Sequence, residues 1–166
     1  MNGFTIAYIT LLAIYIILGF IFTNLMFLYK KRMRQHKKAS RLLIVNKNNE
    51  LKAMQDYLLE KGLEPKSKLF SFDKTNIDEI NDNRPFYIDA LNKAHEEVTT
   101  LFATLDNEED KDFFNNHNQA ILENDNSYRR IVMLHNKTAK TYNNHAKSSF
   151  FIFFIMLFRF DYKKDI

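Results

Sequence analysis

The chain has 166 residues and a formal net charge of +4, with 3 Gly, 2 Pro and no Cys or Trp. So few turn-forming residues argue against a sheet-rich fold, and the absence of cysteine excludes disulfides, thiolate metal sites and a cysteine nucleophile. The length suits one domain with a core of moderate size. We therefore predict an all-α fold, with a single N-terminal transmembrane helix, an up-and-down bundle of three long helices and a short apolar C-terminal helix.

The first predicted element is an apolar helix over residues 4–29, a run of 26 residues without a charged side chain. At about 1.5 Å per residue it spans roughly 39 Å, more than the roughly 30 Å of a bilayer's hydrocarbon core. The preceding "MNGF" carries no basic residue and no A-x-A site follows the run, which argues against a cleaved signal peptide. We predict that residues 1–29 are a retained membrane anchor and residues 30–166 a cytoplasmic helical bundle.

A strongly basic segment follows the anchor and predicts its orientation. Its members are Lys30, Lys31, Arg32, Arg34, Lys37, Lys38 and Arg41. Because Lys and Arg stay on the cytoplasmic side, we expect a single pass through the plasma membrane with the N-terminus outside. Residues 30–68 carry a net charge of +8, and anionic headgroups attract each basic residue by about 1 kcal/mol. Nucleic acid is another partner for a basic block, but no recognition motif accompanies this one, so we expect none.

The next two helices follow from apolar periodicity. The first helix is expected to continue from the membrane to Lys61, with one apolar face, and "KGLEP" should end it through Gly62 and Pro65. Residues 66–84 read as a polar linker. A second helix should begin at residues 83–85 and end near Leu105. The predicted core residues of these helices are Ile44, Leu51, Met54 and Leu58, then Ile88, Leu91, His95, Val98, Phe102 and Leu105.

The third helix is expected to begin with a capping box of Asp106 and Glu109 and to run to about Lys147. It carries a seam with heptad spacing, formed by His117, Ile121, Asn124, Tyr128, Ile131, His135, Thr138, Tyr142 and His145. A purely structural helix would place Leu and Ile there. Either the seam is a polar network inside the bundle or it faces a partner. If it faces a partner, the candidate interaction residues are His117, Tyr128, His135, Tyr142 and His145. Buried histidines would make the bundle sensitive to acid.

No group of residues points to catalysis. The five histidines show no H-x₃-H, H-E-x-x-H or E-x-x-H spacing, which argues against a zincin or a ferritin-like metal pair. Three glycines cannot build a P-loop or a dinucleotide fingerprint, and no G-x-S-x-G occurs. We therefore predict that the chain is not an enzyme and has no catalytic, cofactor-binding or metal-binding residues.

The segment "YRRIVMLHNKTAKTY", residues 128–142, resembles the last long helix of the LemA family, whose pattern is close to Y-N-x-x-V-x-x-Y-N-x-x-I-x-x-F-P. Tyr128, Val132 and Asn136 match in register, whereas His135 and Tyr142 stand where the family has Tyr and Phe. Arg129, Ala139 and Asn143 also depart from the pattern. The resemblance covers the anchor topology and about twenty residues. It implies a bacterial, membrane-tethered up-and-down bundle and no particular reaction.

The last element is the apolar run from Phe150 to Phe158. As a helix it would span about 13–14 Å, less than half of a bilayer core, so a second crossing is not expected. It could fold back as a fourth helix of the bundle, with Phe151, Phe154 and Phe158 as its buried stripe. It could instead lie at the membrane interface or on a protein partner. We favour the fourth helix because three helices in up-down-up order would leave residue 147 far from the anchor.

These features suit a membrane-anchored, non-enzymatic helical scaffold of LemA-like type. Its partner would be an unidentified membrane or cytoplasmic protein or, in a homo-oligomer, a second copy of the chain. The alternative is an accessory or immunity-like subunit of a larger membrane complex. The two hypotheses differ in whether the cytoplasmic bundle folds without a partner. The cytoplasmic bundle of a scaffold should fold alone, whereas that of a subunit should aggregate without its partner. No cofactor is expected in either case.

Overall fold

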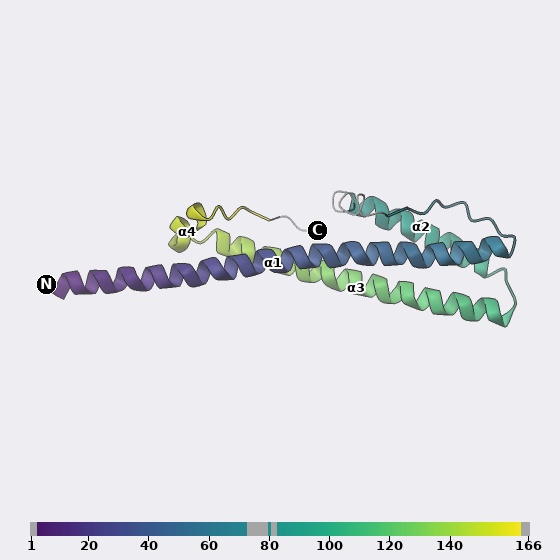
Figure 1. Ribbon diagram of the computed structural model, residues 1–166, viewed down its shortest axis with the longest axis horizontal. Coiled ribbons are helices and arrows are strands. Elements are labelled where there is room, and N and C mark those ends of the chain that lie inside the picture. The colour runs from purple at the N-terminus through teal and green to yellow at the C-terminus, as the bar shows by residue number, and fades with distance from the viewer. Residues whose placement is uncertain (1–2, 73–79, 81–82, 164–166) are drawn as a thin grey trace. The chain divides into compact units, whose positions relative to one another are not determined.

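The computed structural model describes residues 3–72, 80 and 83–163, and this part of the chain is helical without a strand. Four α-helices follow one another: α1 (Gly3–Glu60), α2 (Arg84–Phe102), α3 (Glu108–Ala146) and α4 (Ile152–Leu157). A short 3-10 helix, η2 (Ser149–Phe151), leads into α4. Figure 1 shows α1 as one uninterrupted helix. The predicted all-α fold with a long apolar N-terminal helix and a short C-terminal helix is confirmed.

The end of α1 is built as the sequence predicts. Gly62 has a φ of 78°, the left-handed conformation that glycine adopts without steric cost. The N–H of Leu63 donates to the carbonyl of Leu58 at 2.9 Å, and the N–H of Gly62 donates to that of Leu59 at 3.0 Å. These bonds satisfy carbonyls that have no partner within the helix, so the chain turns sharply after Glu60.

The other helix starts follow local chemistry with one correction. Helix α2 begins at Arg84 with a proline in its first turn, as predicted. Helix α3 begins one residue later than the capping box of Asp106 would place it. The Oδ1 of Asn107 accepts from the N–H of Glu109 at 3.4 Å, and an Asn side chain is as good an N-cap as Asp. The adjacent Asp106 is exposed.

The described chain forms two compact units, which we treat separately. One unit is residues 37–132, and the other combines residues 1–36 with residues 133–166. The unit of residues 37–132 has its own apolar core, contributed by α1, α2, α3 and Ile80 of the linker. Its buried members are Ile44, Leu51, Met54, Leu58, Ile80, Leu91, Ala94, Val98, Phe102 and Ile121. The predicted apolar face of the first soluble helix is thus fully buried.

Within this unit α1 and α2 run parallel, which the up-down-up order does not anticipate. Lys47 contacts Asn92 and Tyr57 stacks near Phe102, so the two helices advance in the same direction. The linker makes the return. Its carbonyls at Ser67 and Phe70 accept hydrogen bonds from the side chains of Gln55 and Asn48, in reverse order along α1. Helix α3 then runs antiparallel to α1.

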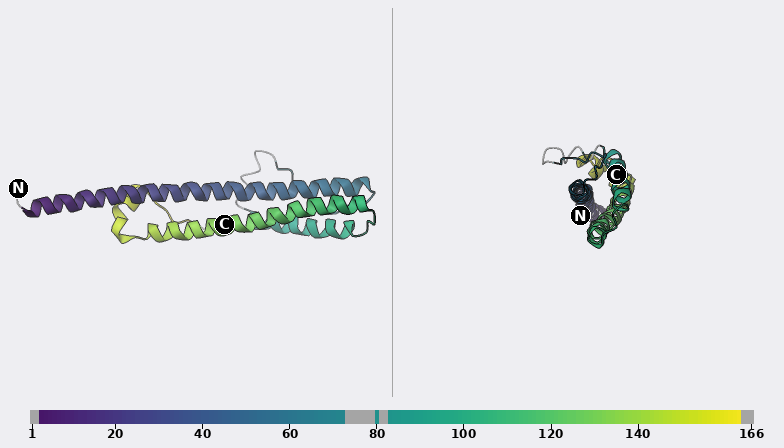
Figure 2. Two further views of the ribbon diagram at one scale, coloured as in Figure 1. Left: turned by 90° about the horizontal axis from the view of Figure 1, so that it is seen from below. Right: turned by 90° about the vertical axis from the view of Figure 1, so that its right-hand side faces the viewer.

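The second unit packs the C-terminal part of the chain against the apolar part of α1. Its buried apolar residues are Phe22, Met26, Met33, Ala139, Tyr142, Phe154 and Phe160. The rings of His145 and Tyr29 lie 5.7 Å apart, so α3 ends beside the anchor segment and not far from it. Both views in Figures 1 and 2 show α4 lying next to α1. The prediction that residue 147 lies far from the anchor was wrong. It counted three helices and left out the linker, which runs back along α1 before α2 begins.

Candidate membrane-binding site

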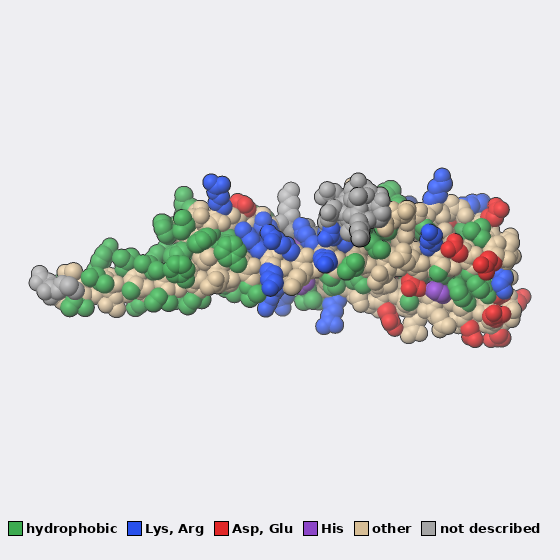
Figure 3. All heavy atoms as spheres, in the orientation of Figure 1, with side chains coloured by type: hydrophobic (Ala, Val, Ile, Leu, Met, Phe, Trp, Pro, Cys, Tyr) green, Lys and Arg blue, Asp and Glu red, His purple; other side chains and the backbone are tan. Residues whose placement is uncertain are grey.

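The first 19 described residues of α1 present an almost entirely apolar surface. Large side chains here are 41–92% exposed, and α1 is long and apolar enough to cross a membrane. Figure 3 shows these hydrophobic side chains along the N-terminal part of the chain, with Lys and Arg side chains gathered beyond them. The exposed residues are Phe4, Ile6, Tyr8, Ile9, Leu11, Leu12, Ile14, Ile16, Ile17, Leu18, Phe20 and Ile21. Soluble monomers rarely expose an apolar surface of this extent.

The predicted basic segment lies on α1 directly after this surface. Lys31, Arg32, Arg34, Lys37 and Lys38 are exposed, and Lys30 and Arg41 are half-buried. The Nζ atom of Lys30 lies 4.8 Å from the ring centroid of Phe160, a cation–π geometry that fixes the ammonium beside the C-terminal segment.

The apolar C-terminal segment packs on the anchor part of α1. The ring of Phe151 stacks on that of Phe22 with centroids 4.4 Å apart, and Phe158 lies 6.0 Å from Phe27. Phe154 is 4% exposed and its ring occupies the space beside Gly19, where an added Cβ would come within 1.9 Å of it. The predicted stripe of Phe151, Phe154 and Phe158 therefore faces inward. The stripe packs against the apolar part of α1, within the unit that combines residues 1–36 and 133–166.

Two residues that sequence reasoning missed complete this contact. Phe160 is 6% exposed and its ring contacts those of Phe22 and Phe27. In the sequence, Arg159 separates it from the apolar run. The φ of Arg159 is 48°, so the chain turns there and directs Phe160 back to the helix. Tyr15 donates a hydrogen bond from its hydroxyl to the carbonyl of Phe150 at 3.0 Å. The signal for the second was a tyrosine hydroxyl in the middle of an apolar run, where it needs a partner within the protein.

The polar seam of α3 faces inward along its whole length, since none of its nine residues is exposed. The Nδ1 of His117 donates to the carboxylate of Glu50 at 2.7 Å, and the Nδ1 of His145 donates to the carbonyl of Thr141 at 2.8 Å. His135 is 1% exposed, with its ring 6.2 Å from that of His36. Burial, followed by a smaller contribution from Asp161, raises the pKa of Tyr142 to about 12. The placement favours a network inside the helices over a partner-facing seam.

Acid is expected to weaken the packing around His36. Burial, reinforced by the charge of Arg32, lowers the pKa of His36 below its usual 6.5. The unfolded chain then binds more protons than the folded chain, so the contribution of His36 to stability is present above about pH 6.5 and is lost as the pH falls below it. The thermal midpoint of the full chain in detergent should fall as the pH drops below about 6.5, and H36Q should reduce that fall. An unchanged pH dependence in H36Q would contradict this role.

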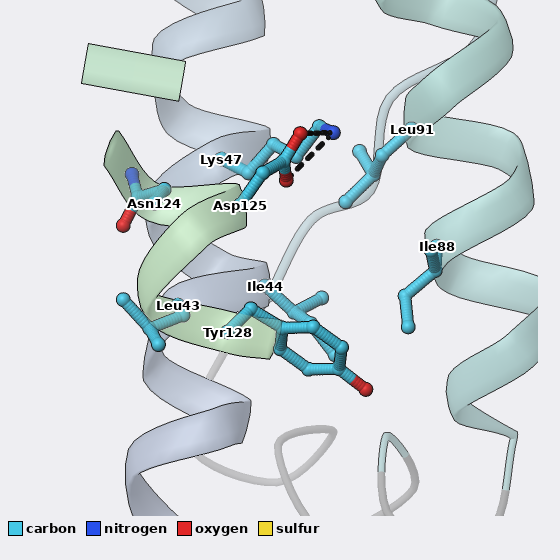
Figure 4. Close-up of a pocket in the computed structure, with 8 residues that line it drawn as sticks. All are labelled: Leu43, Ile44, Lys47, Ile88, Leu91, Asn124, Asp125 and Tyr128. Atoms are coloured by element: carbon cyan, nitrogen blue, oxygen red, sulfur yellow. Dashed lines mark hydrogen bonds and ion pairs between the residues drawn. The ribbon is translucent and has the colours of Figure 1, made fainter. Parts of the chain in front are cut away.

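A buried ion pair joins the three helices of the 37–132 unit and was not singled out by the sequence. The Nζ of Lys47 lies 2.8 Å from Oδ2 of Asp125 on α3 and 2.8 Å from Oδ1 of Asn92 on α2. The Lys47 side chain is 7% exposed and that of Asp125 is 33% exposed. Figure 4 shows the pair beside a small cavity lined with Ile44, Leu91 and Tyr128. At about 20 Å³ the cavity has room for roughly one water and not for a substrate or cofactor.

A second polar cluster fastens the turn between α2 and α3 to the end of α1. The Nζ of Lys61 and the hydroxyl of Tyr57 each lie 2.7 Å from Oδ1 of Asp110. The bonds from Lys61 and then from Tyr57 lower the pKa of Asp110, and the bond to Asp110 raises the pKa of Lys61. The folded carboxylate therefore contributes stability that is present above its unfolded pKa of about 4 and is lost as the pH falls through its lower folded value. Asp110 also lines an open surface pocket together with Phe102 and Phe114.

The described residues offer no evident reaction centre. No three His, Cys, Asp or Glu side chains within the described ranges come together as metal ligands. The geometry instead combines an exposed apolar helix, a basic segment and an apolar C-terminal segment, which together form a surface suited to a lipid bilayer.

Comparisons with known proteins add no further identification. No family model matches the chain, and neither curated proteins nor solved structures gave a significant match. The resemblance of residues 128–142 to the LemA family stays a prediction, and the site has to be interpreted from its own geometry.

Proposed function

We propose that the protein is a membrane-anchored, non-enzymatic helical scaffold that binds a partner protein from a bundle held at the membrane surface. The observation that carries the proposal is that the apolar side chains of the single helix α1 are exposed in its first part and buried in its last part. Its first part exposes apolar side chains as a lipid-facing helix does, and its last part buries Leu51, Met54 and Leu58 in a core of its own. In this account the plasma membrane is crossed once and the N-terminus lies outside, because the basic residues follow the apolar part.

The chemistry of the basic segment supports a membrane with anionic headgroups. Five of its seven members are exposed, and each basic residue near such a surface gains about 1 kcal/mol. The LemA-like type of the proposed scaffold rests on residues 128–142 alone. The alternative function, an accessory or immunity-like subunit of a larger membrane complex, shares the same anchor.

The two functions differ in what residues 37–132 do alone. Because this unit has a continuous core and the Lys47–Asp125 pair within it, we expect the isolated fragment to be soluble and helical and to melt cooperatively. Circular dichroism and a sedimentation profile check this. A fragment that aggregates unless a membrane partner is co-expressed would favour the accessory subunit over the scaffold.

The partner itself is sought by crosslinking in intact membranes followed by affinity capture of the full chain. A scaffold should yield a distinct partner, or a second copy of this chain, that a variant lacking residues 37–132 fails to capture. Orientation is tested separately with a reporter that is active in the cytoplasm alone, fused after Ile166. An active extracytoplasmic reporter at the same position would overturn the proposed orientation.

A further inference from the structure

We propose that residues 148–160 form a re-entrant hairpin that inserts into one leaflet of the bilayer beside α1, on the side of the basic segment. Its ligands are lipid acyl chains, with anionic headgroups at its base. The inference rests on the proposed function, since it requires α1 to be in the bilayer, but it assigns the C-terminal segment a role that anchoring by α1 does not need.

The path of the chain is that of a hairpin. Helix α3 ends with His145 between Tyr29 and Phe22, at ring-centroid distances of 5.7 and 6.4 Å. The chain then advances along α1 until the carbonyl of Phe150 meets the hydroxyl of Tyr15. It returns through the contacts of Phe154 with Gly19, Phe158 with Phe27 and Phe160 with Lys30. Ring contacts of Phe154, Phe158 and Phe160 with α1 hold this return, together with the cation–π pair and the close approach at Gly19.

Both ends of the hairpin are fastened at the end of α3. Ser148 donates its N–H to the carbonyl of His145 at 3.0 Å, which starts the hairpin directly after the helix. Asn143 closes it, because its side chain donates to the carbonyl of Lys163 at 2.7 Å and accepts from the N–H of Lys163 at 2.8 Å. A segment held at both ends in this way can enter a leaflet and leave it on the same side.

The depth of the hairpin matches one leaflet. The apolar run of α1 contains a polar pair, Thr23 and Asn24. A span from Gly3 to Phe22 is about 30 Å long, which equals a hydrocarbon core, so the bilayer edge falls near this pair. Tyr15 lies about 13 Å deeper than Asn24 along the helix, close to the middle of the core. The hairpin therefore reaches from the headgroup level, beside Phe27 and Lys30, to about the midplane at Tyr15.

The outer face of the hairpin is apolar and uncovered. No charged residue occurs from Ser148 to Phe158. Five large side chains of the hairpin are 58–73% exposed, and they are Phe150, Ile152, Phe153, Met156 and Leu157. The ring of Phe150 also meets that of Tyr15 on α1, with centroids 5.4 Å apart. This face is continuous with the exposed apolar surface of α1, in the same compact unit. Acyl chains that surround α1 would cover both.

The backbone of the hairpin is also suited to a medium without water, where polar groups need partners within the protein. The carbonyl of Phe150 at the apex accepts from Tyr15, which equally satisfies the one tyrosine hydroxyl at that depth of α1. On the return, the N–H groups of Phe158 and Phe160 donate to the carbonyls of Phe154 and Ile155, both at 3.1 Å. Gly19 leaves the room that brings Phe154 against the helix.

Basic and amide side chains gather at the base of the hairpin, where headgroups would lie. A shallow groove there is lined by Met133, Asn136, Lys137, Lys140, Asn143, Asn144, Lys147 and Tyr162. The ammonium of Lys147 lies 5.5 Å from the ring centroid of Tyr162. The ammonium of Lys30 lies over the ring of Phe160 at the end of the hairpin. Cationic side chains at this level attract anionic phospholipids.

The absence of cysteine from the natural sequence allows a direct test with single labels. The full chain, reconstituted in vesicles of neutral and anionic phospholipid, carries an environment-sensitive fluorophore on F153C in the hairpin. Matched controls carry it on I17C, on the exposed face of α1, and on L122C, an exposed apolar position in the 37–132 unit. Lipids with a nitroxide in the middle of the acyl chain quench a label that lies in the core.

We expect strong quenching at residues 153 and 17 and none at residue 122. Quenching at residue 17 without quenching at residue 153 would overturn the hairpin and leave the anchor intact, with a protein surface as the cover of the segment. Loss of quenching at both positions would overturn the proposed anchoring itself. A second variant, Y15F in the F153C background, removes the apical hydrogen bond and should reduce quenching at residue 153. Unreduced quenching would contradict the hairpin geometry.

Discussion

Replacing Asp125 with alanine is expected to lower the free energy of unfolding by about 3 kcal/mol, the lower end of the cost of breaking a buried ion pair. The substitution leaves the Lys47 ammonium, whose side chain is 7% exposed, with Asn92 as its remaining recorded side-chain partner. Partial hydration of the one-third exposed Asp125 site keeps the loss from being larger. Thermal and urea unfolding of the full chain in mild detergent, followed by circular dichroism, measures it.

The reverse substitution provides the sharper comparison. K47M removes the cation and leaves Asp125, which water can reach, so it should cost clearly less than D125A. D89A serves as a control, because Asp89 forms an exposed pair with Lys93 within α2, and exposed pairs contribute little to stability. Equal losses for D125A and D89A would show that the pair does not hold the three helices together.

Enlarging Gly19 is expected to release the C-terminal segment from α1. A Cβ at this position would lie 1.9 Å from the ring of Phe154, so the side chain in G19L cannot coexist with the docked ring. Overpacking typically costs about 1–3 kcal/mol, and 1.4 kcal/mol is tenfold in an equilibrium constant, so docking should weaken by about tenfold or more. Leucine keeps the helix apolar, which preserves its suitability for a bilayer.

Disulfide formation between F22C and F151C reports this docking, because the two native rings stack at 4.4 Å and the chain has no other cysteine. The pair should crosslink rapidly in the parent and slowly in G19L. A13L is the matched control, since Ala13 lies on the exposed face of the same helix. Equal crosslinking in G19L and A13L would refute the docking of Phe154 at Gly19.

The sequence predicted the helices well because their signals are local. The apolar run, the face of Ile44, Leu51, Met54 and Leu58, and the Gly62 stop each depend on residues within a few turns of one another. The seam from His117 to His145 was also found by its spacing, and the structure places it inward.

What the sequence could not predict are contacts between distant segments. The parallel course of α1 and α2 depends on a linker that returns along α1, and such a passage has no periodicity of its own. The pairing of Lys47 with Asp125 joins residues 78 positions apart. The docking of Phe154 depends on a glycine inside an apolar helix. The space that this glycine leaves can be interpreted only when the residue packed against it is known.

The measurement that tests the central claim most directly is alkaline carbonate extraction of membranes that contain the full chain. An integral helix stays with the lipid under these conditions, whereas a protein held by charge alone is released. We predict that the full chain remains in the membrane pellet, together with a variant in which the seven basic residues from Lys30 to Arg41 are changed to Gln. Release of the full chain into the supernatant would show that the apolar part of α1 does not cross the membrane, and it would contradict the account.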